Sequence, residues 1–163
     1  MYIDNVQILG FRATIDSIGE TLDLIEGIKK DGEIIQLLNA DSIASKNHII
    51  HGVNQAFLAF ERHENLAKDV SVEIVLRCSA QRQISKAFNI LGLKEGDMNL
   101  CAVLVNCDDY TRELSELFSR DDDVLIPDNE KLMEIYNIDS CEVENMSVEE
   151  IIIDRITKLN VDY

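Results

Sequence analysis

Asn99-Leu100-Cys101-Ala102-Val103-Leu104-Val105 is apolar at nearly every position, and such a run predicts a strand in the middle of a sheet, covered on both faces. Two further strands are expected over residues 2–14 and 33–38. Residues 72–78 alternate apolar and polar side chains with one interruption, which is typical of a strand with one polar face. A short apolar piece, residues 124–126, completes a set of four or five strands.

The segments between these strands have apolar residues at helical spacing. The clearest case is residues 84–91, where Ile84, Ala87, Phe88 and Leu91 recur at helical intervals. Helices are likewise expected over residues 17–30, 42–64, 109–119, 129–136 and 147–159. With one proline and seven glycines, no linker divides the chain. The pattern predicts a single α/β (α+β) domain over residues 1–163, with a mixed four- to five-stranded sheet flanked by helices.

The 163-residue chain is acidic, with a formal charge of −16, and its charge is unevenly spread. Residues 95–163 carry nineteen acidic and five basic side chains, whereas residues 74–94 contain no acidic residue. This balance excludes a protein that coats nucleic acid non-specifically, because such binding depends on neutralising phosphates. The basic island of residues 74–94 is either a local anion site or a solvated helix face. Its cations are Arg77, Arg82, Lys86 and Lys94.

Motifs that carry enzyme chemistry are absent from the sequence. It has no glycine-rich phosphate loop, no GxSxG nucleophile and no HExxH metal motif, so we expect neither an enzyme nor a cofactor. The four cysteines include no CxxC pair, and the composition predicts a chain of a reducing, cytoplasmic compartment without a membrane span. His48 and His51 are three residues apart with no obvious third ligand, so no metal site is expected.

The segment from Arg77 to Lys86 has the strongest chemical signal. If it is the end of a strand, a turn and the start of a helix, Arg77 lies on the polar side of the strand and Ser79 is the helix N-cap. Burial of the apolar side of this helix leaves Arg82 and Lys86 together on the opposite face. Cations, a hydroxyl, two glutamines and unpaired helix N–H groups suit a phosphate backbone or the flexible end of a nucleic acid.

The last expected helix has a wide apolar side. Val148, Ile151, Ile152, Ile156 and Leu159 cover one face. Ile153 lies about 120° from the centre of that face and extends it. A widened stripe indicates either a partner interface or a helix wedged between two internal elements.

Two blocks of the sequence resemble a known family. Residues 41–56, DSIASKNHIIHGVNQA, are similar to the long-helix signature of the small KEOPS-complex accessory subunit called the PRPK-binding protein (TPRKB or CGI-121-like) family. Residues 73–88, EIVLRCSAQRQISKAF, resemble its strand–turn–helix pattern, E-I-L-x-x-L-S-G-x-R-Q-I-x-x-A. Cys78 stands where leucine is usual, and Ala80 replaces the usual glycine. The strongest resemblance spans residues 41–88.

The resemblance implies a non-catalytic subunit of the KEOPS complex, which makes threonylcarbamoyl-adenosine in tRNA. It also implies direct binding to the small kinase/ATPase of the complex, indirect contact with the remaining KEOPS subunits, and capture of the single-stranded 3′ CCA end of tRNA. On this basis the candidate tRNA-binding residues are Arg77, Ser79, Ala80, Gln81, Arg82, Gln83 and Lys86, with Lys46 added from the matched helix. The candidate kinase interface, chosen by its apolar pattern, is Ile152, Ile153 and Ile156.

Two other functions stay open on the sequence alone. The chain could be a kinase-binding regulatory module that makes no contact with RNA, in which case the basic island is a solvated face. It could also be a small hydrolase or metal enzyme built around His48 and His51, and this function needs a third ligand.

Overall fold

Four strands form one sheet, with β3 in its interior. In the computed structural model, which describes residues 2–161, the strand order is β2-β3-β1-β4 and every described pairing is antiparallel. The strands are β1 (Val6–Ile15), β2 (Ile34–Asn39), β3 (Gly96–Val105) and β4 (Ser119–Arg120). The α/β class and the interior position of residues 99–105 are confirmed. The described sheet is antiparallel, where a mixed sheet was expected.

Seven α-helices and three short 3-10 turns occur in residues 2–161. The helices are α1 (Ile18–Ile28), α2 (Lys46–Glu61), α3 (Val70–Ser79), α4 (Ile84–Leu91), α5 (Thr111–Leu117), α6 (Asn129–Ile135) and α7 (Val148–Lys158). The 3-10 turns are η1 (Ala40–Ser42), η2 (Asp122–Leu125) and η3 (Glu142–Glu144). Because η2 covers most of residues 124–126, the strand expected there is wrong. None of these described helices is both long enough and apolar enough to cross a membrane.

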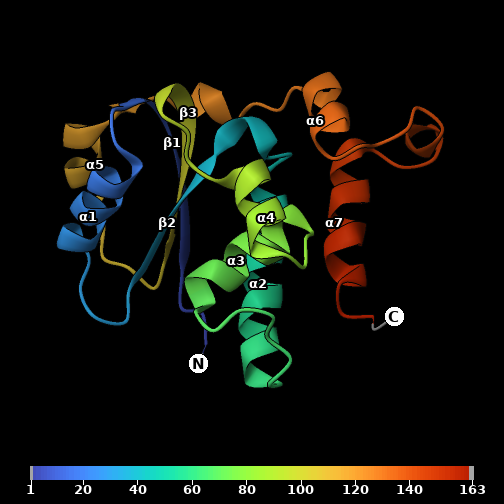
Figure 1. The fold of residues 1–163 in the computed structure, drawn as a ribbon, viewed down its shortest axis with the longest axis horizontal. Coiled ribbons are helices and arrows are strands. Elements are labelled where there is room, and N and C mark those ends of the chain that lie inside the picture. Colours follow the sequence, from blue (N-terminus) through green and yellow to red (C-terminus); the bar gives the residue numbers. More distant parts are fainter. Residues whose placement is uncertain (1, 162–163) are drawn as a thin grey trace.

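The alternating side chains of β3 supply two cores, one on each face of the sheet. Leu100, Ala102 and Leu104 pack with residues of α1 and α5, whereas the side chains of residues 101, 103 and 105 pack with α2, α3 and α4. Figure 1 shows these two helical layers on opposite sides of the sheet. Because both faces are covered, nearly every position of this stretch is apolar.

A third hydrophobic cluster joins α6 and α7 to the side of α2. Leu132, Ile152 and Ile156 are fully buried in it. The hydroxyl of Tyr136 donates to the carbonyl oxygen of Ser42 at 2.6 Å and links the cluster to η1. In Figure 1, α7 stands beside the α2 layer and farther from the sheet than α2 does. This cluster positions the end of α7.

Side-chain caps set the starts of several helices that the sequence predicts. Ser17 caps α1, and Ser147 caps α7 in a capping box with Glu150. α2 starts later than expected, with Ser45 as its cap, because residues 40–42 form a separate 3-10 turn. All six expected helices are confirmed.

Residues 72–78 are not a strand, and this prediction is wrong. They lie in α3, whose N-cap Asp69 accepts a hydrogen bond from the Ser71 amide. The helix is buried on almost every side, so it shows no polar face from which a 3.6-residue period could be recognised. One signal did indicate a helix. Glu73 and Arg77 are four residues apart, the spacing of a helical ion pair.

α2 and α3 cross at Gly52. A Cβ atom at this position would lie 2.3 Å from the Sγ atom of Cys78 and 3.1 Å from its Cα atom. Only a glycine therefore permits this approach of the two helices. Since Cys78 is fully buried at the crossing, the sulfur has no room to move away.

We predict that Gly52→Ala lowers the free energy of unfolding by about 1–3 kcal/mol, because the added methyl group overpacks the helix crossing. The measurement is urea denaturation followed by circular dichroism. Gly27→Ala in α1 is the matched control, since a Cβ atom there meets nothing within 4 Å. That control should gain up to about 1 kcal/mol from helix propensity alone. Similar effects of both changes would contradict the tight crossing.

Candidate functional site

A groove of about 450 Å³ lies between the turn after α3 and the last turn of α7. Ala80, Gln81, Arg82, Gln83 and Lys86 line one side, and Arg155, Lys158 and Leu159 line the other. We call it the cation groove, because four of these lining residues are cations and none is acidic. The structure thus brings five of the predicted site residues together and adds two cations that the sequence did not indicate.

A residue in the left-handed conformation shapes the turn that leads into the groove. Ala80 has a φ of 56° and ends α3. Its amide donates to the carbonyl oxygen of Arg77 at 3.0 Å, and the Gln81 amide donates to that of Leu76 at 3.1 Å. The left-handed region costs a non-glycine residue about 1 kcal/mol or more, which explains the glycine usual in the resembling pattern.

Ser79 does not cap the following helix, so this prediction is wrong. It is the last residue of α3, it is buried, and its hydroxyl donates to the carbonyl oxygen of Leu76 at 3.0 Å. α4 begins instead after Gln83, whose side chain makes no capping bond in the described structure. The first amides of α4 therefore have no side-chain cap, and Gln83, directly before them, lines the groove. Because helix N-termini attract anions, this end of α4 adds to the positive character of the groove.

Arg77 is buried rather than on a polar surface, which is a second correction. Its side chain is 2% exposed, and its Nε donates to Oε2 of Glu73 at 2.8 Å. Its Nη1 donates to Oδ1 of Asn160, also at 2.8 Å, so the guanidinium is bound on both sides. Helical geometry turns this side chain toward α7 and the loop before α3, away from the groove. Arg77 is therefore a structural residue that links Glu73 of α3 to Asn160 and is not among the described lining residues of the groove.

We predict that Arg77→Met destabilises the fold by about 3–5 kcal/mol, because the buried carboxyl group of Glu73 would lose its ion-pair partner. Denaturant unfolding measures this loss. Lys94→Met, which removes an exposed cation of the same basic island, should change stability by less than about 0.5 kcal/mol. A stable Arg77→Met protein that differs only in ligand binding would contradict the structural role.

Arg82 and Lys86 lie at the groove, although α4 does not bury the apolar side that the sequence indicated. Nη2 of Arg82 donates to the carbonyl oxygens of Leu159, at 2.7 Å, and Val161, at 3.0 Å. On α4 only Ala87 and Leu91 are buried. Ile84 and Phe88, expected in the core, are 52% and 38% exposed. They form a separate apolar surface, which we call the α4 patch.

Arg155 and Lys158 complete the groove from α7. Lys158 forms an ion pair with Asp154 at 2.7 Å, and Arg155 forms one with Glu142 at 3.3 Å while donating to the carbonyl oxygen of Tyr136. Basic residues in the last turn of a helix ordinarily complement its dipole. Nothing in the sequence therefore indicated that Arg155 and Lys158 lie beside the turn after α3. Their acidic neighbours neutralise part of the groove's charge.

Lys46 lies outside the cation groove. It is exposed in the first turn of α2 and is not among the described lining residues. Its charge acts on Asp122 of η2, whose pKa is lowered mainly by Arg120 and only to a small extent by Lys46. The structure therefore does not bring Lys46 together with the other predicted residues.

His48 joins the two sequence blocks and is unavailable as a metal ligand. Nδ1 accepts from the Ala44 amide at 3.1 Å, so the proton lies on Nε2, which donates to the carbonyl oxygen of Cys78 at 2.7 Å. His51 instead meets the Thr157 hydroxyl at 2.8 Å on α7. Within residues 2–161 no group of three or more His, Cys, Asp or Glu side chains could hold a metal ion. A metal enzyme built on this pair has no structural support.

Burial lowers the pKa of His48 to about 4. Between pH 4 and 6.5 His48 is neutral in the folded protein but protonated in the unfolded chain, so the unfolded state binds more protons there. We predict that stability falls by about 1.4 kcal/mol per pH unit as the pH drops from about 6.5 toward 4. Urea denaturation at several pH values measures this slope. The His48→Gln protein should be less stable but should lose this part of the pH dependence, and an unchanged slope would contradict the assignment.

α7 buries most of the residues that were selected as a kinase interface. Ile152 and Ile156 are fully buried in the third cluster, and α7 packs against both α2 and α6. They cannot contact a partner in this conformation, because the wide apolar stripe serves two internal contacts. Ile153 is half-buried and is the one residue of that set still accessible.

Comparison with known proteins places the chain in a family. Residues 15–159 match a family model described as kinase binding protein CGI-121. This chain belongs to the CGI-121 family. It is also 38% identical over 127 residues to a protein named regulatory protein Cgi121 of Methanocaldococcus jannaschii, with 70% of this chain and 81% of the relative covered.

Membership of the CGI-121 family confirms the resemblance drawn from residues 41–56 and 73–88. The matched region contains both blocks, and in the fold they touch at Gly52 and His48. The family is described by kinase binding and regulation rather than by a catalysed reaction. The coarse function of a CGI-121 protein is therefore that of a kinase-binding regulatory protein.

Proposed function

We propose that this CGI-121 protein is a non-catalytic, cytoplasmic KEOPS subunit that binds the small kinase/ATPase of the complex and holds the 3′ CCA end of tRNA in the cation groove. The observation that supports RNA binding is the convergence of Arg82, Lys86, Arg155 and Lys158 on one groove of a chain with charge −16. Acidic surfaces repel tRNA elsewhere, so a single cationic groove favours one docking orientation.

The composition of the groove suits a flexible single strand. Arg82 and Arg155 present guanidinium groups that can bind phosphate or stack on a base, and Gln81 and Gln83 add neutral hydrogen-bonding groups. No aromatic side chain is among the described lining residues, so backbone contacts dominate and base preference is weak. Because Asp154 and Glu142 already pair with Lys158 and Arg155, contact with two to four phosphates is expected.

The test compares intact tRNA with tRNA trimmed of its 3′ CCA, using purified protein over a salt series. Contact with two to four phosphates of a single strand predicts a log–log slope of about −1.5 to −3. We expect trimming to abolish binding. Equal affinity for both tRNAs would move the site elsewhere, and no binding of either would favour a kinase-binding module without RNA contact.

The Lys86→Glu variant tests whether tRNA binds in the groove. Reversal of this charge should weaken tRNA binding at least tenfold, since it removes one phosphate contact and adds a repulsive carboxylate. Lys94→Glu is the matched control, because Lys94 is an exposed cation of the same basic island that does not line the groove. Equal losses in both variants would show that the effect is one of net charge alone.

Kinase binding needs an accessible apolar surface, and among the accessible apolar side chains of residues 2–161 we consider the α4 patch and Ile153 of α7. The α4 patch, Ile84 and Phe88, is the more exposed, whereas Ile153 on α7 is half-buried. Exposed apolar side chains at i and i+4 on one helix form a compact contact of the kind that interfaces bury. We therefore place the kinase contact on the α4 patch and keep Ile153 as the alternative.

We predict that Phe88→Glu abolishes binding to the small kinase while leaving tRNA binding unchanged, because it inserts a charge into an apolar contact. Calorimetry with the purified kinase measures the first effect, and the tRNA assay above measures the second. Ile153→Glu is tested in parallel. Loss of kinase binding only in the Ile153→Glu protein would return the interface to α7.

A further inference from the structure

The residues directly after α7 border the cation groove on one side and accept hydrogen bonds from Arg82. The carbonyl oxygens of Leu159 and Val161 both accept from Nη2 of Arg82, at 2.7 and 3.0 Å. Arg82 is therefore bound to the protein's own backbone, and these carbonyl oxygens occupy donors that a phosphate would use. Leu159 is at the same time a lining residue of the groove.

Asn160 anchors this backbone segment to the core. Its Oδ1 accepts from Nη1 of Arg77 at 2.8 Å, and its Nδ2 donates to Oε1 of Gln55 at 2.5 Å. Arg77 is itself held by the buried Glu73, so one of the two anchors is fixed inside the protein. The segment 159–161 is thus tied down at its centre, while its two outer carbonyl groups bind Arg82.

A second cavity lies behind the segment. It measures about 370 Å³ and is lined by Glu64, Leu66, Arg77, Arg82, Leu159 and Asn160. Arg82 and Leu159 line both this cavity and the cation groove, so the contact between them forms the partition. Movement of residues 159–161 would join the two spaces and release the Nη2 donors of Arg82 toward an incoming anion.

We propose that residues 159–161 form an autoinhibitory latch over the cation groove, which single-stranded RNA must displace from Arg82 to bind fully. The proposal rests on the proposed function, since it concerns the regulation of the same site. A latch of this kind lowers the affinity for any short strand and favours RNA that makes additional contacts elsewhere on the complex.

The first test does not depend on RNA. Modification of Arg82 by phenylglyoxal, followed by mass spectrometry, reports whether its guanidinium is covered. Asn160→Ala removes both anchor bonds and should accelerate modification of Arg82 several-fold, while Gln55→Ala removes only the outer anchor and should have a smaller effect. Asn145→Ala, an exposed asparagine in the loop before α7, is the matched control. Unchanged modification in the Asn160→Ala protein would overturn the latch, whatever the RNA result.

The second test measures affinity for a short RNA oligonucleotide that ends in CCA. Asn160→Ala should bind it at least about tenfold more tightly than the native protein, as expected for release of one hydrogen bond to a charged group. Weaker binding by this variant would overturn inhibition, because it would show that the carbonyl groups position Arg82 for RNA. Faster modification without RNA binding by either protein would refute the proposed function and the inhibitory role together. Intact RNA binding with unchanged modification would refute the latch alone.

Discussion

The buried ion pair between Glu73 and Arg77 connects the candidate site to the rest of the fold. One oxygen of Glu73 accepts from the amides of Leu66 and Ala67, and the other accepts from Arg77, so the carboxylate is satisfied by protein groups. Arg77 in turn binds Asn160. A single pair thereby ties α3 to the loop before it and to the end of α7. Such a pair fixes geometry more than it adds stability, because desolvation of two charges offsets much of their attraction.

Most elements could be predicted from the sequence, including the strand β3 that is covered on both faces, whereas the buried helix α3 could not. The start of α7 was predicted within one residue, since Ser147 and Glu150 form a capping box directly before an amphipathic stripe. α3 was mistaken for a strand because it is buried on almost all sides, and its residues 72–78 alternate apolar and polar side chains with one interruption, as a strand does. The tertiary environment then decides between helix and strand, and within residues 72–78 only the i, i+4 spacing of Glu73 and Arg77 favoured the helix.

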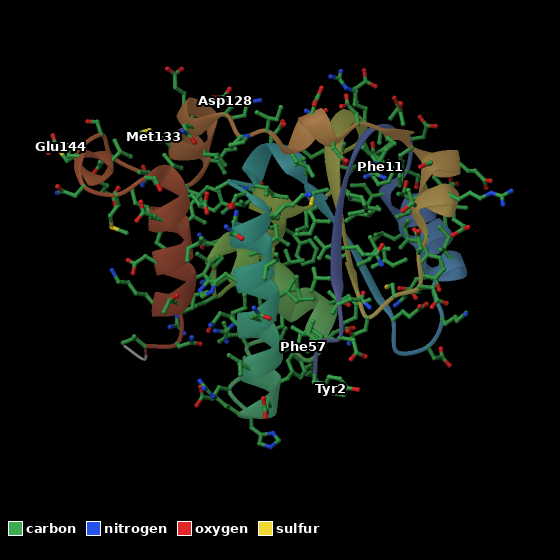
Figure 2. The ribbon with its side chains drawn as sticks, turned by 180° about the vertical axis from the view of Figure 1, so that it is seen from behind. Tyr2, Phe11, Phe57, Asp128, Met133 and Glu144 are labelled. Atoms are coloured by element: carbon green, nitrogen blue, oxygen red, sulfur yellow. The ribbon has the colours of Figure 1, made fainter. Side chains whose placement is uncertain are left out.

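Only one side of the cation groove could be predicted from the sequence. Ala80 to Gln83 and Lys86 lie within seven consecutive residues, so one turn brings them together whatever precedes it. Arg155 and Lys158 come from a strongly acidic part of the chain, and only the packing of α7 beside α2 brings them to that turn. His48 shows a further limit. The sequence raised it only as a possible metal ligand, but two backbone partners allow the imidazole to be buried. Figure 2 shows Tyr2, from the segment before β1, near Phe57 at the lower end of α2, and both side chains line the same groove.

The third hydrophobic cluster has a consequence for the lifetime of the groove. α6 and α7 share a core of their own, and several of their links to the main cores are polar, among them Tyr136 to Ser42 and His51 to Thr157. Segments with a separate core open and close as cooperative units below the free energy of global unfolding. Since two of the four groove cations belong to α7, the groove exists only while this unit is docked. The groove therefore behaves like an interface between the unit of α6 and α7 and the rest of the protein. The fraction of time for which the groove is formed depends on the docking of that unit rather than on the stability of the sheet.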